Sequence, residues 1–332
     1  MTFDLKAAVK YLIMFLIGMG ILYLAFQGQD LMKIWQEIKA ANLYYVAVSS
    51  LSAWLAYVLR ALRWQMLYRS IHYEVNFSTA YHAVMIGYLA NLALPRFGEI
   101  VRCSAIHKST KVPLFASLGT VITERLFDVL VLLLAGLALL IFQYDLVSHF
   151  LQNIIYHHIR EKFNQINYRW LFILGALLIF CIGISIYILR RKVGKKFLRI
   201  FVSLRQGFGS YSKMKRKRTF LLYTIGIWSL YLLSMYFCFS ALAVTRNLQF
   251  DAAFTALVFS GFAMAAPVQG GIGVFHWMVG QSLALYSISF KDGLAYATII
   301  HSSQVLIILI LGGLSLFKVI MASKKKLETN HR

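Results

Sequence analysis

Apolar residues dominate the chain in long runs that are separated by short clusters of polar and charged residues. A helix of about 20 apolar residues is long enough to cross the roughly 30 Å hydrocarbon core of a bilayer. We predict transmembrane helices at residues 11–27, 43–64, 117–143, 168–189, 219–243 and 293–318. The pattern therefore predicts an all-α integral membrane protein with about six full spans.

Two further apolar stretches contain helix breakers near their middle. The first reads YHAVMIGYLANLAL and is followed by Pro95. The second contains AAPVQGGIGVFHW, whose third residue is Pro267. Proline and glycine both disfavour a continuous helix. We therefore predict two broken hairpins, at about residues 76–112 and 252–288.

Charge indicates how these elements are oriented. Basic residues concentrate in the 190–218 segment and in the tail at 319–332, and positively charged loops of membrane proteins lie on the cytoplasmic side. We place the loop after the second span on the same side because of Arg60, Arg63 and Arg69. This orientation places both the N- and the C-terminus in the cytoplasm.

The orientation makes both hairpins re-entrant. Residues 97–112 are too few and too charged to cross a bilayer, so the first hairpin begins and ends at the cytoplasmic face. The second begins and ends at the outer face. Broken segments that enter from opposite faces are associated with substrate sites near the middle of the bilayer. Because residues 76–94 are long enough for a complete span, eight crossings is the alternative.

Composition agrees with a membrane protein and excludes several other classes. Of 332 residues, 60% are hydrophobic and 14% are charged, and the mean hydropathy is +0.68. We expect one polytopic membrane domain over residues 1–332, in the cytoplasmic membrane of a cell. The net charge of +22 is explained by cytoplasmic loops, so we expect no nucleic-acid partner. The three cysteines have neither metal-ligand nor disulfide spacing, and we expect no metal and no cofactor.

Ionisable residues occur where lipid is expected. Six of them lie near the first break or within span 117–143, and their charges sum to zero: Arg96, Glu99, Arg102, Glu124, Arg125 and Asp128. Each charged residue at the centre of a membrane helix costs about 2.5–3.5 kcal/mol, so six unpaired charges would cost about 15–20 kcal/mol. They must pair or meet water. We predict a polar network that joins the first hairpin to this span and includes Asn91.

Two interpretations of this network remain open. In the first, it only holds the hairpin in place. In the second, at least one arginine faces a cavity and binds a lipid phosphate, aided by the helix N-termini that follow each break. Arg96 is the leading candidate because helix neighbours are least able to saturate it. The candidate substrate-binding residues are Arg96, Arg102, Arg125, Gly270, Gly271, Gly273 and His276.

No catalytic motif is evident. We find no Ser/His/Asp set, no HExxH motif, no paired cysteine ligands and no nucleotide-binding loop. The chain is therefore expected not to be an enzyme. Transport by such a protein would run downhill or be coupled to an ion.

Three motifs together resemble a known family. The pattern N-x-x-L-P-R-x-G-E-x-x-R spans Asn91 to Arg102, E-R-x-x-D spans Glu124 to Asp128, and P-x-x-G-G-I-G spans Pro267 to Gly273. In this order they resemble the transmembrane region of lysylphosphatidylglycerol synthases, a flippase-like family. The resemblance implies translocation of a phospholipid or lipid-linked anionic molecule between leaflets. Its partners would be membrane lipids, and the oligomeric state stays open.

The chain departs from the family pattern in two ways. The soluble aminoacyl-transferase module of true synthases does not follow the membrane region, so we expect no aminoacylation by this polypeptide. Many members also carry a proline before the glycines and an acid after them, whereas this chain has Gln269 and His276. The alternative function is a membrane-embedded transferase or an accessory subunit of lipid or glycolipid modification.

Overall fold

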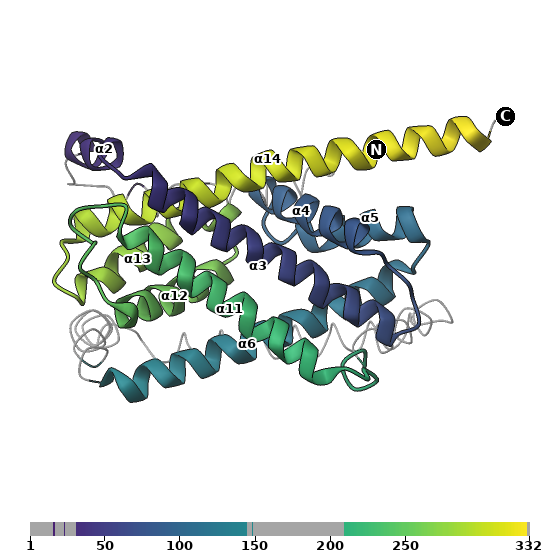
Figure 1. Ribbon diagram of the computed structural model, residues 1–332, viewed down its shortest axis with the longest axis horizontal. Coiled ribbons are helices and arrows are strands. Elements are labelled where there is room, and N and C mark those ends of the chain that lie inside the picture. The colour runs from purple at the N-terminus through teal and green to yellow at the C-terminus, as the bar shows by residue number, and fades with distance from the viewer. Residues whose placement is uncertain (1–15, 17–22, 24–30, 145–147, 149–208, 331–332) are drawn as a thin grey trace, which may run out of the picture.

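A computed structural model describes residues 31–144 and 209–330, together with the single positions 16, 23 and 148. The described parts of the chain are helical and contain no strand. The helices are α2 (Leu31–Lys39), α3 (Leu43–Ser70), α4 (Phe77–Ala93), α5 (Gly98–Thr110), α6 (Leu114–Phe142), α11 (Lys217–Phe239), α12 (Phe250–Ala265), the 3-10 turn η2 (Gln269–Gly271), α13 (Val274–Ala284) and α14 (Phe290–Asn330) (Figure 1). The protein is an all-α membrane protein, as the sequence predicts.

Four of the described helices are long and apolar enough to cross a membrane. They are α3, α6, α11 and the Phe290–Met321 part of α14, which correspond to the predicted spans 43–64, 117–143, 219–243 and 293–318. The predicted spans 11–27 and 168–189 lie outside the described residues, as does most of the basic 190–218 segment.

Two helices extend beyond their predicted ends. Helix α3 continues to Ser70, and α14 continues to Asn330 through most of the predicted tail at 319–332. The KKKLE segment of that tail consists of good helix formers, so charge ends the membrane span there without ending the helix.

Asparagine side chains mark the starts of two helices. Asn42 Oδ1 accepts a hydrogen bond from the Tyr44 N–H at 3.0 Å, at the start of α3. Asn76 Oδ1 accepts one from the Thr79 N–H at 2.8 Å, at the start of α4. Each side chain satisfies a backbone donor that has no partner within its own helix. Helix α4, the first helix of the α4–α5 hairpin, therefore begins directly after Asn76.

Helices α3 and α11 run side by side in opposite directions (Figure 1). Near the start of α3, the Ser49 hydroxyl donates to the Ser234 carbonyl near the end of α11 at 2.7 Å. Near the end of α3, Arg63 Nη1 donates to Thr224 Oγ1 near the start of α11 at 3.1 Å. The C-terminal ends of these two helices consequently lie at opposite ends of the molecule.

The two broken segments therefore begin from opposite ends. The α4–α5 hairpin follows α3 and the α12–α13 hairpin follows α11, and the two occupy opposite halves of the molecule in Figure 1. Helix α14 packs along both. A Cβ on Gly312 of α14 would lie 2.9 Å from Leu89 of α4, and a Cβ on Gly293 of α14 would lie 3.0 Å from the backbone of Gly280 of α13.

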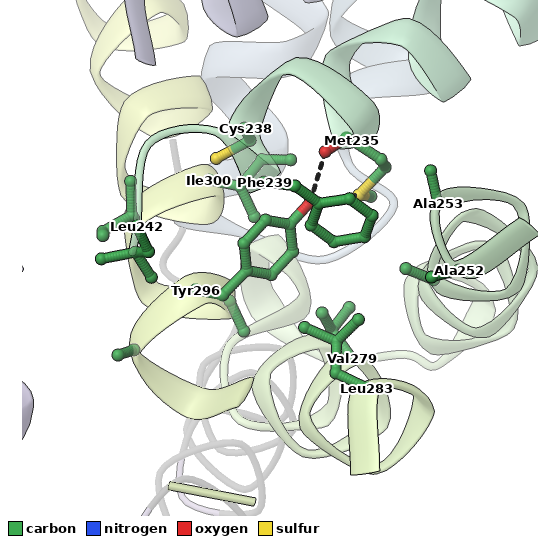
Figure 2. Close-up of a cluster of buried hydrophobic side chains, with 14 of the residues drawn as sticks. Met235, Cys238, Phe239, Leu242, Ala252, Ala253, Val279, Leu283, Tyr296 and Ile300 are labelled. Atoms are coloured by element: carbon green, nitrogen blue, oxygen red, sulfur yellow. Dashed lines mark hydrogen bonds between the residues drawn. The ribbon is translucent and has the colours of Figure 1, made fainter. Parts of the chain in front are cut away.

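An apolar cluster holds the second hairpin in place. Side chains from α11, α12, α13 and α14 meet there (Figure 2), among them Phe239, Ala253, Val279, Leu283 and Tyr296. The Tyr296 hydroxyl donates to the Met235 carbonyl at 2.7 Å. Aliphatic and aromatic packing therefore dominates this half of the described structure.

Candidate functional site

The first break is a short turn between α4 and α5. Helix α4 ends at Ala93, Leu94 is extended, and Pro95 follows. Arg96 then adopts a left-handed backbone with φ of 60°, and the Phe97 N–H closes the turn on the Leu94 carbonyl at 3.2 Å. A left-handed non-glycine residue costs of order 1–3 kcal/mol, and such residues cluster at functional sites.

Asn91 and two glycines bring α4 and α5 together behind this turn. Asn91 Oδ1 accepts the Gly98 N–H at 2.7 Å, at the start of α5. A Cβ on Gly98 would collide with the Gly87 carbonyl and lie 2.7 Å from the Asn91 side chain. Only glycine fits this approach. One N–H at the start of α5 is therefore already bonded within the protein and is not available to an anion.

The second break is a glycine turn between α12 and α13. Helix α12 ends at Ala265, Pro267 follows, and the three glycines Gly270, Gly271 and Gly273 adopt φ of 57°, 77° and 83°. These backbone conformations favour glycine. His301 Nε2 of α14 donates to the Gly270 carbonyl at 2.8 Å, which anchors the turn to the neighbouring span.

The two breaks meet, and each caps the other. Arg96 Nη2 donates to the carbonyl of Ala265, the last residue of α12, at 2.7 Å. Gln269 Nε2 donates to the carbonyl of Ala93, the last residue of α4, at 2.9 Å. The last carbonyls of a helix have no partner within that helix. Each hairpin therefore supplies a hydrogen-bond donor to one such carbonyl of the other hairpin. Arg96 and Ala265 are exposed.

A buried set of ion pairs lies beside the first hairpin. This set, the ion cluster, consists of Arg60, Arg63, Glu99, Arg102, Glu124, Arg125 and Asp128. Glu124 is completely buried. Its Oε1 accepts from Arg60 Nη1 at 2.7 Å, and its Oε2 accepts from Arg102 Nη1 at 3.1 Å.

The remaining pairs extend the ion cluster to Asp128 and Glu99. Asp128 accepts from Arg60 at 2.8 Å and from Arg63 at 2.7 Å. Arg125 Nη2 lies 3.1 Å from Glu99 Oε1, and Arg125 Nη1 lies 3.7 Å from Asp128 Oδ2. Helices α3, α5 and α6 are thus joined through charged groups, and Glu99 and Arg102 connect the α4–α5 hairpin to α6.

The membership of the ion cluster differs from the prediction. Arg96 lies at the junction of the breaks, and Arg60 and Arg63 take part in the pairing instead. Both lie within the predicted span 43–64, where the sequence analysis uses them only to orient the loop that follows, and their exposed fractions are 5% and 0%. Their spacing of three residues places them on one face of α3. That spacing within an apolar span, opposite Glu124 and Asp128, was the signal that could have identified them.

His276 lies near the second break on α13 and is buried. Its ring meets the ring of His301 edge to face at 4.9 Å, and His301 stacks on Phe275. The two histidines therefore belong to the packing between α13 and α14 behind the glycine turn. Among the described residues, no group of three or more His, Cys, Asp or Glu side chains is arranged to hold a metal ion.

The structure thus separates the predicted site residues into two groups. Arg96, Pro95, Pro267 and the three glycines lie at the junction of the breaks, and Gln269 joins them there. Arg102, Glu124 and Asp128 lie in the buried ion cluster. Arg125 and Glu99 are its more exposed members, with side chains 40% and 22% exposed.

A family comparison agrees with this architecture. The model of the lysylphosphatidylglycerol synthase transmembrane region matches residues 11–312. The chain belongs to this family. No curated protein and no solved structure matches the chain. The family assignment indicates a multi-pass membrane protein involved in lipid modification or translocation, with membrane lipids as its partners.

Proposed function

We propose that this protein moves a phospholipid or a lipid-linked anionic molecule between the leaflets of the cytoplasmic membrane. The observation that carries the proposal is the junction of two interrupted hairpins that start from opposite ends of the molecule. Backbone that leaves a helix within a membrane is tolerated only where it is buried in protein or lines a wet cavity. The exposed Arg96 at this junction supports the second case.

Arg96 is the residue that would receive the headgroup phosphate. One of its N–H groups donates to the Ala265 carbonyl, and its side chain is otherwise exposed. A guanidinium has five N–H donors, so it can hold a phosphate while keeping one backbone contact. The strained φ of Arg96 places this charge where a glycine would be easier to accommodate, which supports a role beyond architecture.

The second break would complete the path. Helix α13 begins at Val274 directly after the glycine turn, so its first N–H groups lie next to the junction and favour an anion. His276 follows within the first turn of α13. Acyl chains would stay in the lipid while the headgroup passes between the two turns.

The ion cluster does not support the transferase alternative. Glu124 accepts hydrogen bonds from Arg60, Arg63 and Arg102, and Glu99 pairs with Arg125. The three arginines occupy both oxygens of Glu124. Glu124 therefore does not resemble a free general base.

The test is lipid movement in liposomes that contain the purified protein. A fluorescent anionic phospholipid placed in one leaflet should reach the other leaflet faster with wild-type protein than in empty liposomes. Arg96→Gly removes the guanidinium but suits the left-handed backbone, so it should abolish movement and leave the thermal unfolding midpoint nearly unchanged. Arg69→Ala, at an exposed arginine on α3, is the matched control and should transport normally.

Two results would contradict the proposal. Equal transport by wild type and Arg96→Gly would show that the junction is architecture only. Chemical conversion of the lipid, detected by mass spectrometry, in place of movement would favour the transferase.

A further inference from the structure

One edge of the buried Arg102 guanidinium group, here called its open edge, has no hydrogen-bond partner among the described residues. Arg102 is 3% exposed, and its Nη1 donates to Glu124 Oε2 at 3.1 Å. Its Nε and Nη2 are also buried, and among the described residues neither atom has a hydrogen-bond partner. These two N–H groups point the same way from one edge of the planar guanidinium, and that edge can bind two oxygens of one anion at once.

Two other arginines of the ion cluster do not show this feature. In Arg63 and Arg125 the buried atom without a partner is Nε alone, because both Nη atoms of each have partners: Thr224 and Asp128 for Arg63, and Glu99 and Asp128 for Arg125. In Arg60, Nη1 pairs with Glu124 and Asp128, and Nε is the buried atom without a partner. A single Nε–H cannot hold an anion bidentately. Arg102 is the arginine of the ion cluster for which both atoms of this edge, Nε and Nη2, are buried without a partner among the described residues.

The ring of Trp64 does not fill this edge. The Arg102 Cζ atom lies 4.6 Å from the centre of the Trp64 ring, so the ring covers a face of the guanidinium. The Nε–H and Nη2–H groups lie in the guanidinium plane and point away from that face. The cation–π contact and an in-plane anion are compatible with one another.

Charge balance also calls for an anion. The ion cluster contains four guanidinium groups and three carboxylates, which leaves one positive charge in excess. An uncompensated buried charge is costly. One singly charged anion would neutralise the ion cluster and occupy the open edge of Arg102.

We propose that Arg102 holds a singly charged phosphate group in the ion cluster. This chemistry is shared by the phosphodiester of a lipid headgroup and by free dihydrogen phosphate. The site differs from the junction at Arg96, and its existence does not depend on lipid movement.

The experiment is a binding titration of the full-length protein in detergent. Inorganic phosphate and dihexanoyl phosphatidylglycerol are titrated separately by calorimetry into the wild type, Arg102→Lys and Arg69→Lys. Arg69 is exposed and lies outside the ion cluster. Lysine keeps the charge but loses the planar edge. At least one ligand should bind the wild type, and it should bind Arg102→Lys at least tenfold more weakly, which corresponds to about 1.4 kcal/mol. Binding to Arg69→Lys should change less than threefold.

The two sources of phosphate give different results. Binding of inorganic phosphate alone identifies a free anion as the ligand, and binding of the short-chain lipid alone identifies a headgroup. The proposal is overturned if neither ligand binds the wild type, or if Arg102→Lys binds as tightly as the wild type.

A measurement on the wild type keeps the proposal testable if Arg102→Lys does not fold. At constant ionic strength, replacing chloride with the ligand that binds should raise the thermal unfolding midpoint, because a ligand that binds only the folded state stabilises it. An unchanged midpoint in both ligands would also overturn the proposal.

Discussion

The two hairpins have the same broken-helix plan but are held in place by different forces. The α4–α5 hairpin carries Arg96, Glu99 and Arg102 and is tied to α6 by directional ion pairs. Between residues 252 and 288 the chain has no charged residue, and the α12–α13 hairpin packs in the apolar cluster of Figure 2. An ion pair is lost completely when either partner is removed, whereas apolar packing is weakened gradually as side chains are shortened.

This contrast can be followed with native cysteines. Cys103 lies on α5 and Cys238 lies on α11 in the apolar cluster, and both are completely buried. In a background with Cys181→Ser, each remaining thiol reports on the opening of one half of the molecule. Reaction with a thiol reagent, resolved by peptide mass spectrometry, distinguishes the two sites.

The largest expected effect is that of Glu124→Gln. Glu124 bonds to three arginines, and breaking a buried ion pair costs about 3–5 kcal/mol because a charge is left uncompensated. We expect a strongly lowered unfolding midpoint and rapid labelling of Cys103, with Cys238 still protected. Glu74→Gln, at an exposed acid, is the control and should change neither. Simultaneous exposure of both thiols would show that the halves do not respond separately.

A smaller and opposite pattern is expected for Leu283→Ala. Leu283 is completely buried in the apolar cluster, and such truncations cost about 2–5 kcal/mol, depending on how well the cavity collapses. Labelling of Cys238 should increase while Cys103 stays protected. The contrast between the hairpins is wrong if Cys103 is the thiol that reacts first.

The smallest effect is expected for Asn91→Ala. This change removes the acceptor of the Gly98 N–H at the start of α5, and loss of such a cap costs about 1 kcal/mol. The unfolding midpoint should fall slightly, and labelling of Cys103 should rise less than in Glu124→Gln. Asn247→Ala, at an exposed loop residue, is the matched control. An effect as large as that of Glu124→Gln would mean that the turn, and not the ion cluster, holds the hairpin.

Local signals in the sequence were sufficient for the described spans and both breaks. Long apolar runs predict α3, α6, α11 and α14, and Pro95 and Pro267 each follow the end of a helix. Arg60 and Arg63 lie within the predicted span 43–64, but charge counting uses them only to orient the following loop and does not indicate that they belong to the ion cluster. Burial against two carboxylates makes them part of the interior instead.

The mutual capping of the two breaks could not be predicted. Arg96 and Ala265 are separated by 169 positions, and neither hydrophobic periodicity nor local charge indicates a contact over that distance. Gln269 was recognised only as a departure from the family pattern. The structure shows what this residue does, since its amide donates to the end of α4.

The most direct test of the account is the side of the membrane from which each hairpin starts. In a cysteine-free background, single cysteines replace the exposed residues Glu74 and Lys108 at the open end of the first hairpin, and Asn247 and Ser289 at that of the second. An impermeant thiol reagent applied to sealed vesicles should label 74 and 108 from the cytoplasmic face only, and 247 and 289 from the outer face only. Labelling of 74 and 108 from opposite faces would mean that α4 crosses the membrane completely, and would contradict the account.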